Sequence, residues 1–240
     1  MKPQLRVTPP LEDLVPVALR LIDEHGLGEF SMRRLSAEVG VFVNVLYRRC
    51  ASKEHLLDLV ADAVLAEVAL PADDIPPREW LHAVGLDLRS AVRRHPHVAG
   101  LINASSRGRQ SSARLTDAVL RTLSRADLDV EGQLGAAAAY YGFVLGTALL
   151  EGGRHRGPEP APDLVLDDLP HLAAARDHVR AALAQGDDVD AMSDRGFAAG
   201  LDAVLRAVLP QLVAASPQEI AAGLRRPATR RPGSARHRLN

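Results

Sequence analysis

Basic and polar side chains gather between Ser31 and Lys53, where their types suit contact with a nucleic acid. Five basic residues in this segment oppose a single acid, Glu38, so the segment carries a net charge of +4. The basic residues are Arg33, Arg34, Arg48, Arg49 and Lys53. Such side chains neutralise phosphates, which supplies much of the affinity of a protein for DNA. Asparagine and valine, both present in the same segment, suit adenine and the thymine methyl group.

Two short helices must position these groups. Ser31 precedes an expected helix over Met32–Val39, Gly40 breaks it, and a second short helix is expected over Val43–Arg49. A glycine permits the tight turn of a helix-turn-helix, in which the second helix presents one face to a DNA groove.

An amphipathic helix precedes this pair and ends at Gly26. Pro16 would interrupt it if it began at Thr8, but is tolerated if Asp13 is the N-cap.

Other residues with chemical potential have ordinary structural explanations. The pairs Asp73-Asp74, Asp167-Asp168 and Asp187-Asp188 resemble those of Mg²⁺-dependent diphosphate enzymes. They fall in predicted loops or at helix ends, where aspartate is favoured anyway. His95-Pro96-His97 lacks a third metal ligand at a fixed spacing, so a hydrogen-bonded structural histidine is favoured. Cys50, the one cysteine, is expected to be a small core residue rather than a redox sensor.

Apolar residues recur at intervals of three and four throughout, which predicts an all-α fold. Ser52 is expected to cap a helix that extends to Leu70. Further helices are expected at residues 78–94, 97–103, 112–125, 129–152, 171–185 and 195–213. The proline-rich stretch from Pro71 to Pro77 marks a break, residues 152–168 form a loop, and the basic tail at 216–240 has little to bury.

Composition excludes several classes of protein. The 240 residues carry a net charge of −1, so this is no uniformly basic DNA-packaging protein. With one cysteine no intrachain disulfide can form, and the N-terminus lacks the apolar core of a signal peptide, so we expect a cytoplasmic protein. Residues 132–150 carry no charge and approach the length of a membrane span, but their alanines and glycines favour a helix buried on most sides within protein.

The order of several residue groups resembles the tetracycline repressor (TetR) family of transcriptional regulators. The resemblance lies in Ala18-Leu-Arg-Leu-Ile-Asp-Glu-His-Gly26, Phe30-Ser-Met-Arg-Arg-Leu-Ser-Ala-Glu-Val-Gly-Val41, Leu46-Tyr47 and Ser52-Lys-Glu-His-Leu-Leu57. It covers about 45 N-terminal residues. In the second half, Glu79-Trp80-Leu81, Arg93-Arg-His-Pro96, Gly142-Phe-Val-Leu-Gly146 and Glu151-Gly152 are similar to the tetracycline-repressor-type C-terminal domain.

The resemblance implies three parts: a helix-turn-helix DNA-binding domain at residues 1–55, a larger helical ligand-binding and dimerisation domain at 56–215, and the tail at 216–240. It implies phosphate contacts by Tyr47 and Lys53, a helix cap at Ser31, and DNA contact by Arg33. Four further residues are implied to face the major groove: Val43, Asn44, Val45 and Arg49. Two residues depart from the pattern. Phe42 replaces a common polar cap, and Cys50 replaces a bulkier apolar residue.

The family pattern also implies an effector pocket and a dimer. Candidate ligand-binding residues, chosen by type and position, are Trp80, Leu101, Asn103, Tyr140, Tyr141, Phe143 and His155. The expected dimer interface combines the helices at 129–152 and 195–213, with Phe197, Leu201, Val204, Leu205 and Val208 at helical spacing on the second.

We therefore expect a homodimeric repressor, released from operator DNA by a small molecule that is tetracycline-like or otherwise. We expect no catalytic residues, cofactor or metal. Two alternatives remain open: an all-helical Mg²⁺-dependent enzyme using the aspartate pairs, and a helical scaffold whose DNA-binding domain has degenerated through changes such as Phe42.

Overall fold

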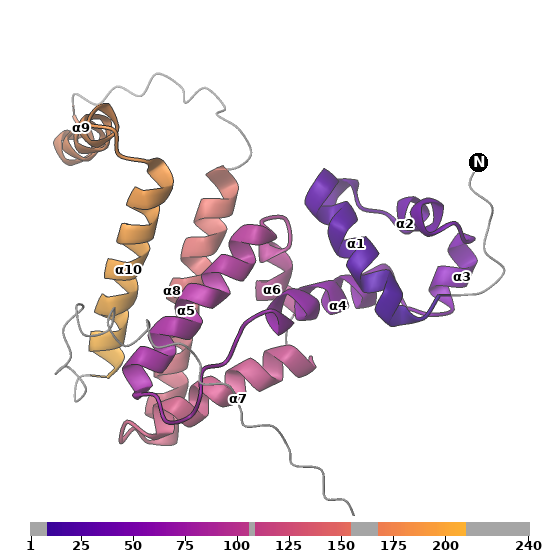
Figure 1. Cartoon of the computed structure of the whole chain (residues 1–240), viewed down its shortest axis with the longest axis horizontal. Coiled ribbons are helices and arrows are strands. Elements are labelled where there is room, and N and C mark those ends of the chain that lie inside the picture. Colours follow the sequence, from indigo (N-terminus) through magenta and orange to yellow (C-terminus); the bar gives the residue numbers. More distant parts are fainter. Residues whose placement is uncertain (1–8, 106–108, 155–167, 210–240) are drawn as a thin grey trace, which may run out of the picture.

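The fold is all-α, as predicted. The computed structural model describes residues 9–105, 109–154 and 168–209, and every regular element in these ranges is helical. The helices are α1 (Leu11–His25), the 3-10 turn η1 (Leu27–Glu29), α2 (Met32–Val39), α3 (Val43–Tyr47), α4 (Lys53–Ala66), α5 (Pro77–Arg94), α6 (Ala99–Ser105), α7 (Gln110–Ser124), α8 (Val130–Arg154), α9 (Pro170–Ala184) and α10 (Val189–Val208). Helices α1–α3 lie at one end of the molecule, and α4 runs from them into the bundle of α5–α10 (Figure 1).

Helix α1 begins before Asp13, the N-cap that would have placed Pro16 in its first turn. Pro10, not Asp13, stands at its N-cap, so Pro16 lies inside the helix. Because proline has no N–H, the helix forgoes the hydrogen bond that residue 16 would donate to the carbonyl of Glu12. The buried face of Leu14, Ala18 and Ile22 keeps the helix in place against its neighbours.

Helix α4 packs against helices of both the N-terminal group and the bundle. It contacts α1 at one end and α6 and α7 further along. Leu56, Val60 and Val64 are fully buried and follow one another at four-residue spacing, so a single helical stripe serves both contacts. The helix ends at Ala66 rather than at the predicted Leu70.

Helices α5, α8 and α10 pack closely because small residues stand where they cross. A Cβ added at Gly200 of α10 would lie 2.5 Å from Cζ of Phe143 on α8. One added at Gly85 of α5 would lie 2.9 Å from a methyl group of Leu201. A side chain at either glycine would require the Phe143 or Leu201 side chain, or the helices themselves, to shift.

Helix α10 differs from its prediction in both extent and orientation. It begins at Val189, six residues before the predicted start, with Asp188 at the N-cap and Asp190 in the first turn, where acids are favourable. Its predicted end at 213 lies outside the described residues. Phe197, Leu201 and Leu205 are buried within the chain, so these residues do not form an outward interface.

Helix α8 is less buried than expected. Over Val130–Gly152 it is long and apolar enough to cross a membrane, and 28% of its most apolar 18-residue stretch is buried. The prediction of a helix buried on most sides is therefore wrong for the single chain. One face packs on α5, α7 and α10, and the other leaves Leu134 and Leu150 exposed. Such length and composition alone are weak evidence for a membrane span, since core helices share them.

A buried ion-pair network fastens the same three helices. Arg89 of α5 donates to both carboxylate oxygens of Glu151 on α8, at 3.0 and 2.8 Å, and to Asp194 on α10 at 2.8 Å. Ser193 also donates to Glu151, at 2.5 Å. The Arg89 guanidinium lies 4.6 Å from the ring centroid of Phe197. Arg78 and Asp202 form a second buried pair between α5 and α10.

We predict that Glu151→Gln lowers the free energy of unfolding by about 3 kcal/mol at neutral pH, because it leaves the Arg89 charge buried without its main partner. Burial opposes ionisation of Glu151, but hydrogen bonds from Arg89 and Ser193 outweigh it and lower its pKa below the ordinary 4.5. A lowered pKa means that the pair stabilises the fold above pH 4.5 and that this stability is lost as pH falls through the folded-state value.

Urea denaturation at neutral and acid pH measures both effects. The wild-type protein should lose stability below pH 4.5 more steeply than Glu151→Gln. Arg176→Ala is the control, because its pair with Asp177 is exposed and should change stability by less than about 0.5 kcal/mol. An unchanged urea midpoint for Glu151→Gln would contradict the prediction.

Candidate DNA-binding surface and effector cavity

The first short helix of the motif is capped as expected. Ser31 has extended backbone geometry and its hydroxyl oxygen accepts a hydrogen bond from the backbone N–H of Arg34, at 3.2 Å. Leu35 is fully buried, and Arg33 is exposed on the opposite side. Helix α2 therefore presents a basic side chain to solvent while its apolar face stays in the core.

Gly40 makes the turn. Its φ of 79° and ψ of 30° are left-handed, a conformation that costs glycine little. The backbone N–H groups of Gly40 and Val41 both donate to the carbonyl of Ser36, which closes the end of α2. Phe42 follows at the N-cap of α3, has no side-chain capping bond, and is 62% exposed.

Helix α3 is anchored on one side and open on the other. Leu46 is fully buried, and Val43 and Val45 are half-buried against the core. Asn44 and Tyr47 are exposed, as are Arg48 and Arg49 after the last helical residue. The helix spans Val43–Tyr47, two residues shorter than predicted. This exposed set combines an amide, a phenol and two guanidinium groups, which are donors and acceptors for phosphates and base edges.

Cys50 lies beneath this surface. It is fully buried, and its thiol donates to the carbonyl of Leu46 at 3.2 Å. Burial raises the pKa of the Cys50 thiol, which keeps it in the unreactive protonated form. The interpretation as a core residue is thus supported.

Lys53 is held by the chain itself. Its ammonium group donates to the backbone carbonyl of Phe30 at 2.8 Å and lies 5.7 Å from the centroid of the Phe30 ring. Lys53 therefore ties the start of α4 to the residue before the Ser31 cap. A lysine has three N–H donors, so this bond leaves two for a phosphate.

Glu38, the one acid of residues 31–53, pairs with a residue outside the exposed basic and polar set. Glu38 accepts from Arg20 of α1 at 2.9 Å. The pairing offsets the one negative charge of residues 31–53, so Arg33, Arg48 and Arg49 set the local electrostatics.

A histidine joins the N-terminal helices to the rest of the molecule. His95, at the end of α5, lies 2.8 Å from Asp23 of α1 through Nδ1 and 3.1 Å from Glu67 at the end of α4 through Nε2. Arg94 also donates to Glu67, at 2.7 Å. This cluster connects the ends of α4 and α5 to α1. The histidine is hydrogen-bonded, as the sequence favoured.

A cavity of about 190 Å³ lies between α4, α5, α6, α7 and α8. Its lining is mostly apolar, with hydroxyl groups from α7 and α8. The lining residues include Leu65, Leu88, Ile102, Ser112, Leu115, Thr116, Tyr141 and Leu145. Thr116 is exposed, so the cavity reaches the surface at α7.

Tyr141 gives this cavity its polar character. Its hydroxyl oxygen is buried and forms no hydrogen bond of normal geometry among the described residues. Burial raises the pKa of Tyr141 to about 12, while the nearby Thr116 hydroxyl acts to lower it. An unsatisfied buried hydroxyl costs free energy, and a ligand oxygen or nitrogen in the cavity would recover it.

The other predicted ligand-binding residues lie elsewhere. Trp80 and Tyr140 are fully buried in the core, where they donate to the carbonyls of Pro71 and Leu81 at 3.1 and 2.8 Å. Phe143 packs on Phe197 with 5.4 Å between ring centroids. The structure brings none of these three to the cavity that Tyr141 lines.

The remaining candidates are only partly described. Leu101 is half-buried on α6. Asn103 lies on the same helix, but its side chain is outside the described set, as is the whole of His155. Sequence reasoning missed Ser112, Leu115 and Thr116, because their role depends on which helix faces α8. Leu115 and Thr122 are both buried and stand seven residues apart, a spacing typical of one helix face, but such spacing does not specify the helix that this face contacts.

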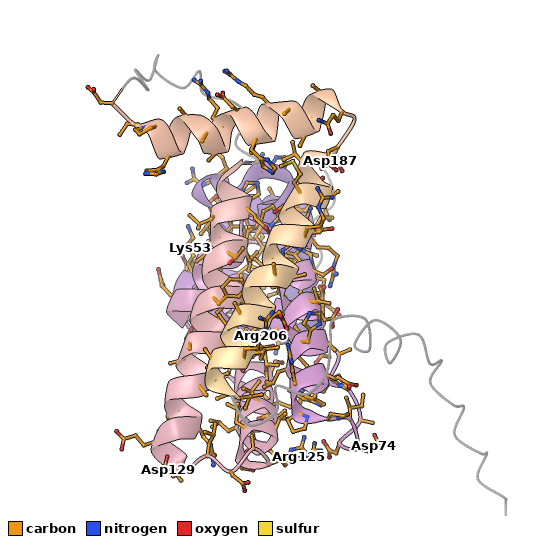
Figure 2. All side chains as sticks on the ribbon, turned by 90° about the vertical axis from the view of Figure 1, so that its left-hand side faces the viewer. Lys53, Asp74, Arg125, Asp129, Asp187 and Arg206 are labelled. Carbon is orange, nitrogen blue, oxygen red and sulfur yellow. The ribbon has the colours of Figure 1, made fainter. Side chains whose placement is uncertain are left out.

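The structure does not assemble the aspartate pairs into a site. Asp74 and Asp187 lie at opposite ends of the molecule (Figure 2). Asp73 pairs with Arg121 at 2.7 Å, Asp187 pairs with Arg195 at 2.5 Å, and Asp167 lies outside the described residues. Within the described ranges, no group of three or more histidine, cysteine or acidic side chains is placed to hold a metal ion.

Known proteins share both parts of this architecture. The family model described as "Bacterial regulatory proteins, tetR family" matches residues 14–60. An HTH-type transcriptional regulator of Saccharopolyspora erythraea is 29% identical over 77% of this chain and 80% of its own. The class D tetracycline repressor of Escherichia coli is 27% identical over 85% and 90%.

A solved structure extends the likeness to a DNA complex. BioQ bound to its double-stranded DNA operator is 29% identical, covers 62% of this chain and 90% of its own, and superposes with a TM-score of 0.57. The family match falls on the helices that carry the exposed basic and polar set, and the full-length relatives are transcriptional regulators and repressors. Residues 14–60 of this protein thus form a domain of the tetR family of bacterial regulatory proteins, and most of the chain is similar to transcriptional regulators of that type.

Proposed function

We propose that this chain is a homodimeric transcriptional repressor that leaves its operator when a small molecule enters the cavity beside Tyr141. Residues 1–55 bind DNA, and residues 56–215 bind the effector and dimerise. The tail at 216–240 lies outside the described residues. We place its action in the cytoplasm. The observation that carries the proposal is α3, anchored by Leu46 and presenting Asn44, Tyr47 and Arg49 to solvent.

The DNA contacts follow from this surface. Asn44 suits a bidentate bond to adenine, the half-exposed faces of Val43 and Val45 suit thymine methyl groups, and Arg49 suits guanine or phosphate. Arg33, Tyr47 and the free donors of Lys53 contact phosphates on either side, and Ser31 fixes the start of α2. BioQ, which shares the fold, is known with its operator bound.

Dimerisation accounts for the exposed face of α8. Gly135, Ala138, Ala139 and Gly142 are exposed there, between Leu134 and Leu150. Small exposed residues also follow one face of α10, at Gly196, Ala199 and Ala203. The two helices run side by side along one face of the molecule (Figure 2), so two copies can form a four-helix bundle about a two-fold axis.

The enzyme alternative lacks support, since the aspartate pairs are separated and the relatives regulate transcription.

The cavity limits the size and charge of the effector. Its volume lies below the roughly 300–1,000 Å³ of pockets for drug-sized ligands, and its lining holds hydroxyl groups but no charged group. We propose a compact, uncharged and mainly apolar effector with an oxygen or nitrogen facing Tyr141.

Mobility shift with the DNA that flanks its own gene tests DNA binding. We predict that the wild-type chain retains a palindromic fragment, with half-sites about 34 Å apart. Tyr47→Ala and Arg49→Ala should each weaken binding at least about tenfold, because each removes a contact in both half-sites. Arg176→Ala on α9 is the control and should bind as the wild type does. Failure to retain any such fragment would contradict the proposal.

We predict that Ala138→Arg converts the protein to monomers, because a charged side chain would be buried at the contact between two α8 helices. Sedimentation equilibrium measures the change. Ala113→Arg, at an exposed position of α7, should remain dimeric. If Ala138→Arg sediments as a dimer, the interface lies on another face.

Effector binding can be tested with a panel of small neutral aromatic and aliphatic alcohols and ketones. A binder should raise the thermal midpoint and release the retained DNA. Tyr141→Phe should weaken this binder about tenfold by removing one hydrogen bond, and leave DNA affinity in its absence unchanged. Tyr140→Phe is the matched control: it loses the bond to Leu81 and some stability, but keeps effector affinity. Equal effects of the two variants would contradict the assignment of the cavity.

A further inference from the structure

Phe42 stands at the start of the helix that enters the groove and is open to solvent. It occupies the N-cap of α3 with extended backbone angles, φ −74° and ψ 148°, and 62% of it is exposed. No side chain accepts from the first N–H groups of this helix at that position. A serine or aspartate would supply that acceptor, so a phenylalanine here gives up a helix cap and exposes an aromatic ring.

The exposure is specific to this end of the molecule. Among the described residues of α1–α4, the large hydrophobic side chains that are strongly exposed are Phe42 and Tyr47, one before and one at the end of α3. Phe30 and Leu46, by contrast, are buried. The N-terminal helices thus bury their other large apolar groups and leave Phe42 outside, next to exposed Asn44.

The position of Phe42 determines which groups of the DNA it can contact. Side chains at the N-terminal end of a recognition helix contact base edges in the major groove. The thymine C5-methyl is the apolar group that the four bases present in that groove, and phenylalanine is among the side chains that contact it. The phosphate contacts are proposed for other residues, Arg33, Tyr47 and Lys53, so Phe42 is left to contact a base.

We propose that Phe42 is a specificity-determining residue that packs on the methyl group of one thymine in each half-site of the operator. This rests on the proposed DNA-binding function and adds a base preference to it. Phe42 thus provides no capping hydrogen bond but makes an apolar contact that a serine at this position could not make. It therefore contributes to sequence recognition and does not indicate a degenerate motif.

The contact can be measured one methyl group at a time. A duplex is first selected by the wild-type protein from a random pool, and its thymines are then replaced by deoxyuridine, symmetrically in both half-sites. We expect one symmetric pair of thymines whose replacement weakens wild-type binding roughly fourfold per half-site, as the loss of one buried methyl group implies. Phe42→Ala should bind more weakly and show no penalty, within about 1.5-fold, at that pair.

Two further variants separate this contact from general effects. Phe42→Ser should raise the thermal midpoint, because it restores a capping oxygen to α3, and yet lose the deoxyuridine penalty. Tyr47→Ala should weaken binding to every duplex and retain the penalty, because its contact is to phosphate.

The outcomes distinguish this inference from the function on which it rests. If the wild-type protein selects no duplex, the DNA-binding function itself fails. If it selects one but no thymine shows a penalty, or Phe42→Ala shows the same penalty as the wild type, Phe42 does not read thymine. Tighter binding by Phe42→Ser to the selected duplex would likewise overturn the inference and identify Phe42 as a defect of the cap.

Discussion

The structure depends on one continuous helix that contacts both the N-terminal helices and the bundle. Helix α4 contacts α1, its buried stripe begins at Leu56, and at Leu65 it lines the cavity between the bundle helices. Residues nine apart on a single helix cannot move independently, since a helix is stiff over two to three turns. The cluster of His95, Asp23 and Glu67 closes the same connection from the other side. The helix that lines the cavity is therefore also a helix on which α1 packs.

The N-terminal region could be predicted from sequence because its determinants are local. Ser31, Gly40 and Ser52 each fix a helix end within a few residues of themselves, and the structure has all three in those roles. The cavity could not be predicted in this way. Tyr140 and Tyr141 are adjacent and of one type, yet one hydroxyl bonds a carbonyl of α5 and the other has no such bond. That difference depends on the rotation of α8 against α5 and α7, which a single sequence does not specify.

The same limit explains the error at α10. The apolar spacing of Phe197, Leu201 and Leu205 is equally suited to an interface within the chain and to one between chains. Gly85 and Gly200 decide between them, because they let α10 approach α5 and α8 closely enough to bury that face. The small exposed residues of α8 and α10, which we propose as the partner surface, have a spacing that is visible in the sequence but carries little apolar signal. Apolar periodicity therefore identified the buried stripe of α10 but assigned it to a contact between chains, whereas it packs within the chain.

Release of DNA requires that the effector distinguish two conformations. A ligand that bound equally well to both would shift neither, however tight its binding. The cavity meets this condition through its walls: Leu65 belongs to α4, Ile102 to α6 and Leu115 to α7, so its shape changes whenever α4 moves relative to the other two. The buried Arg89–Glu151 network holds α5, α8 and α10 together. Under the proposed function, a cavity held on that side would expand around a ligand through α4, α6 and α7, and α4 contacts α1 of the N-terminal helices.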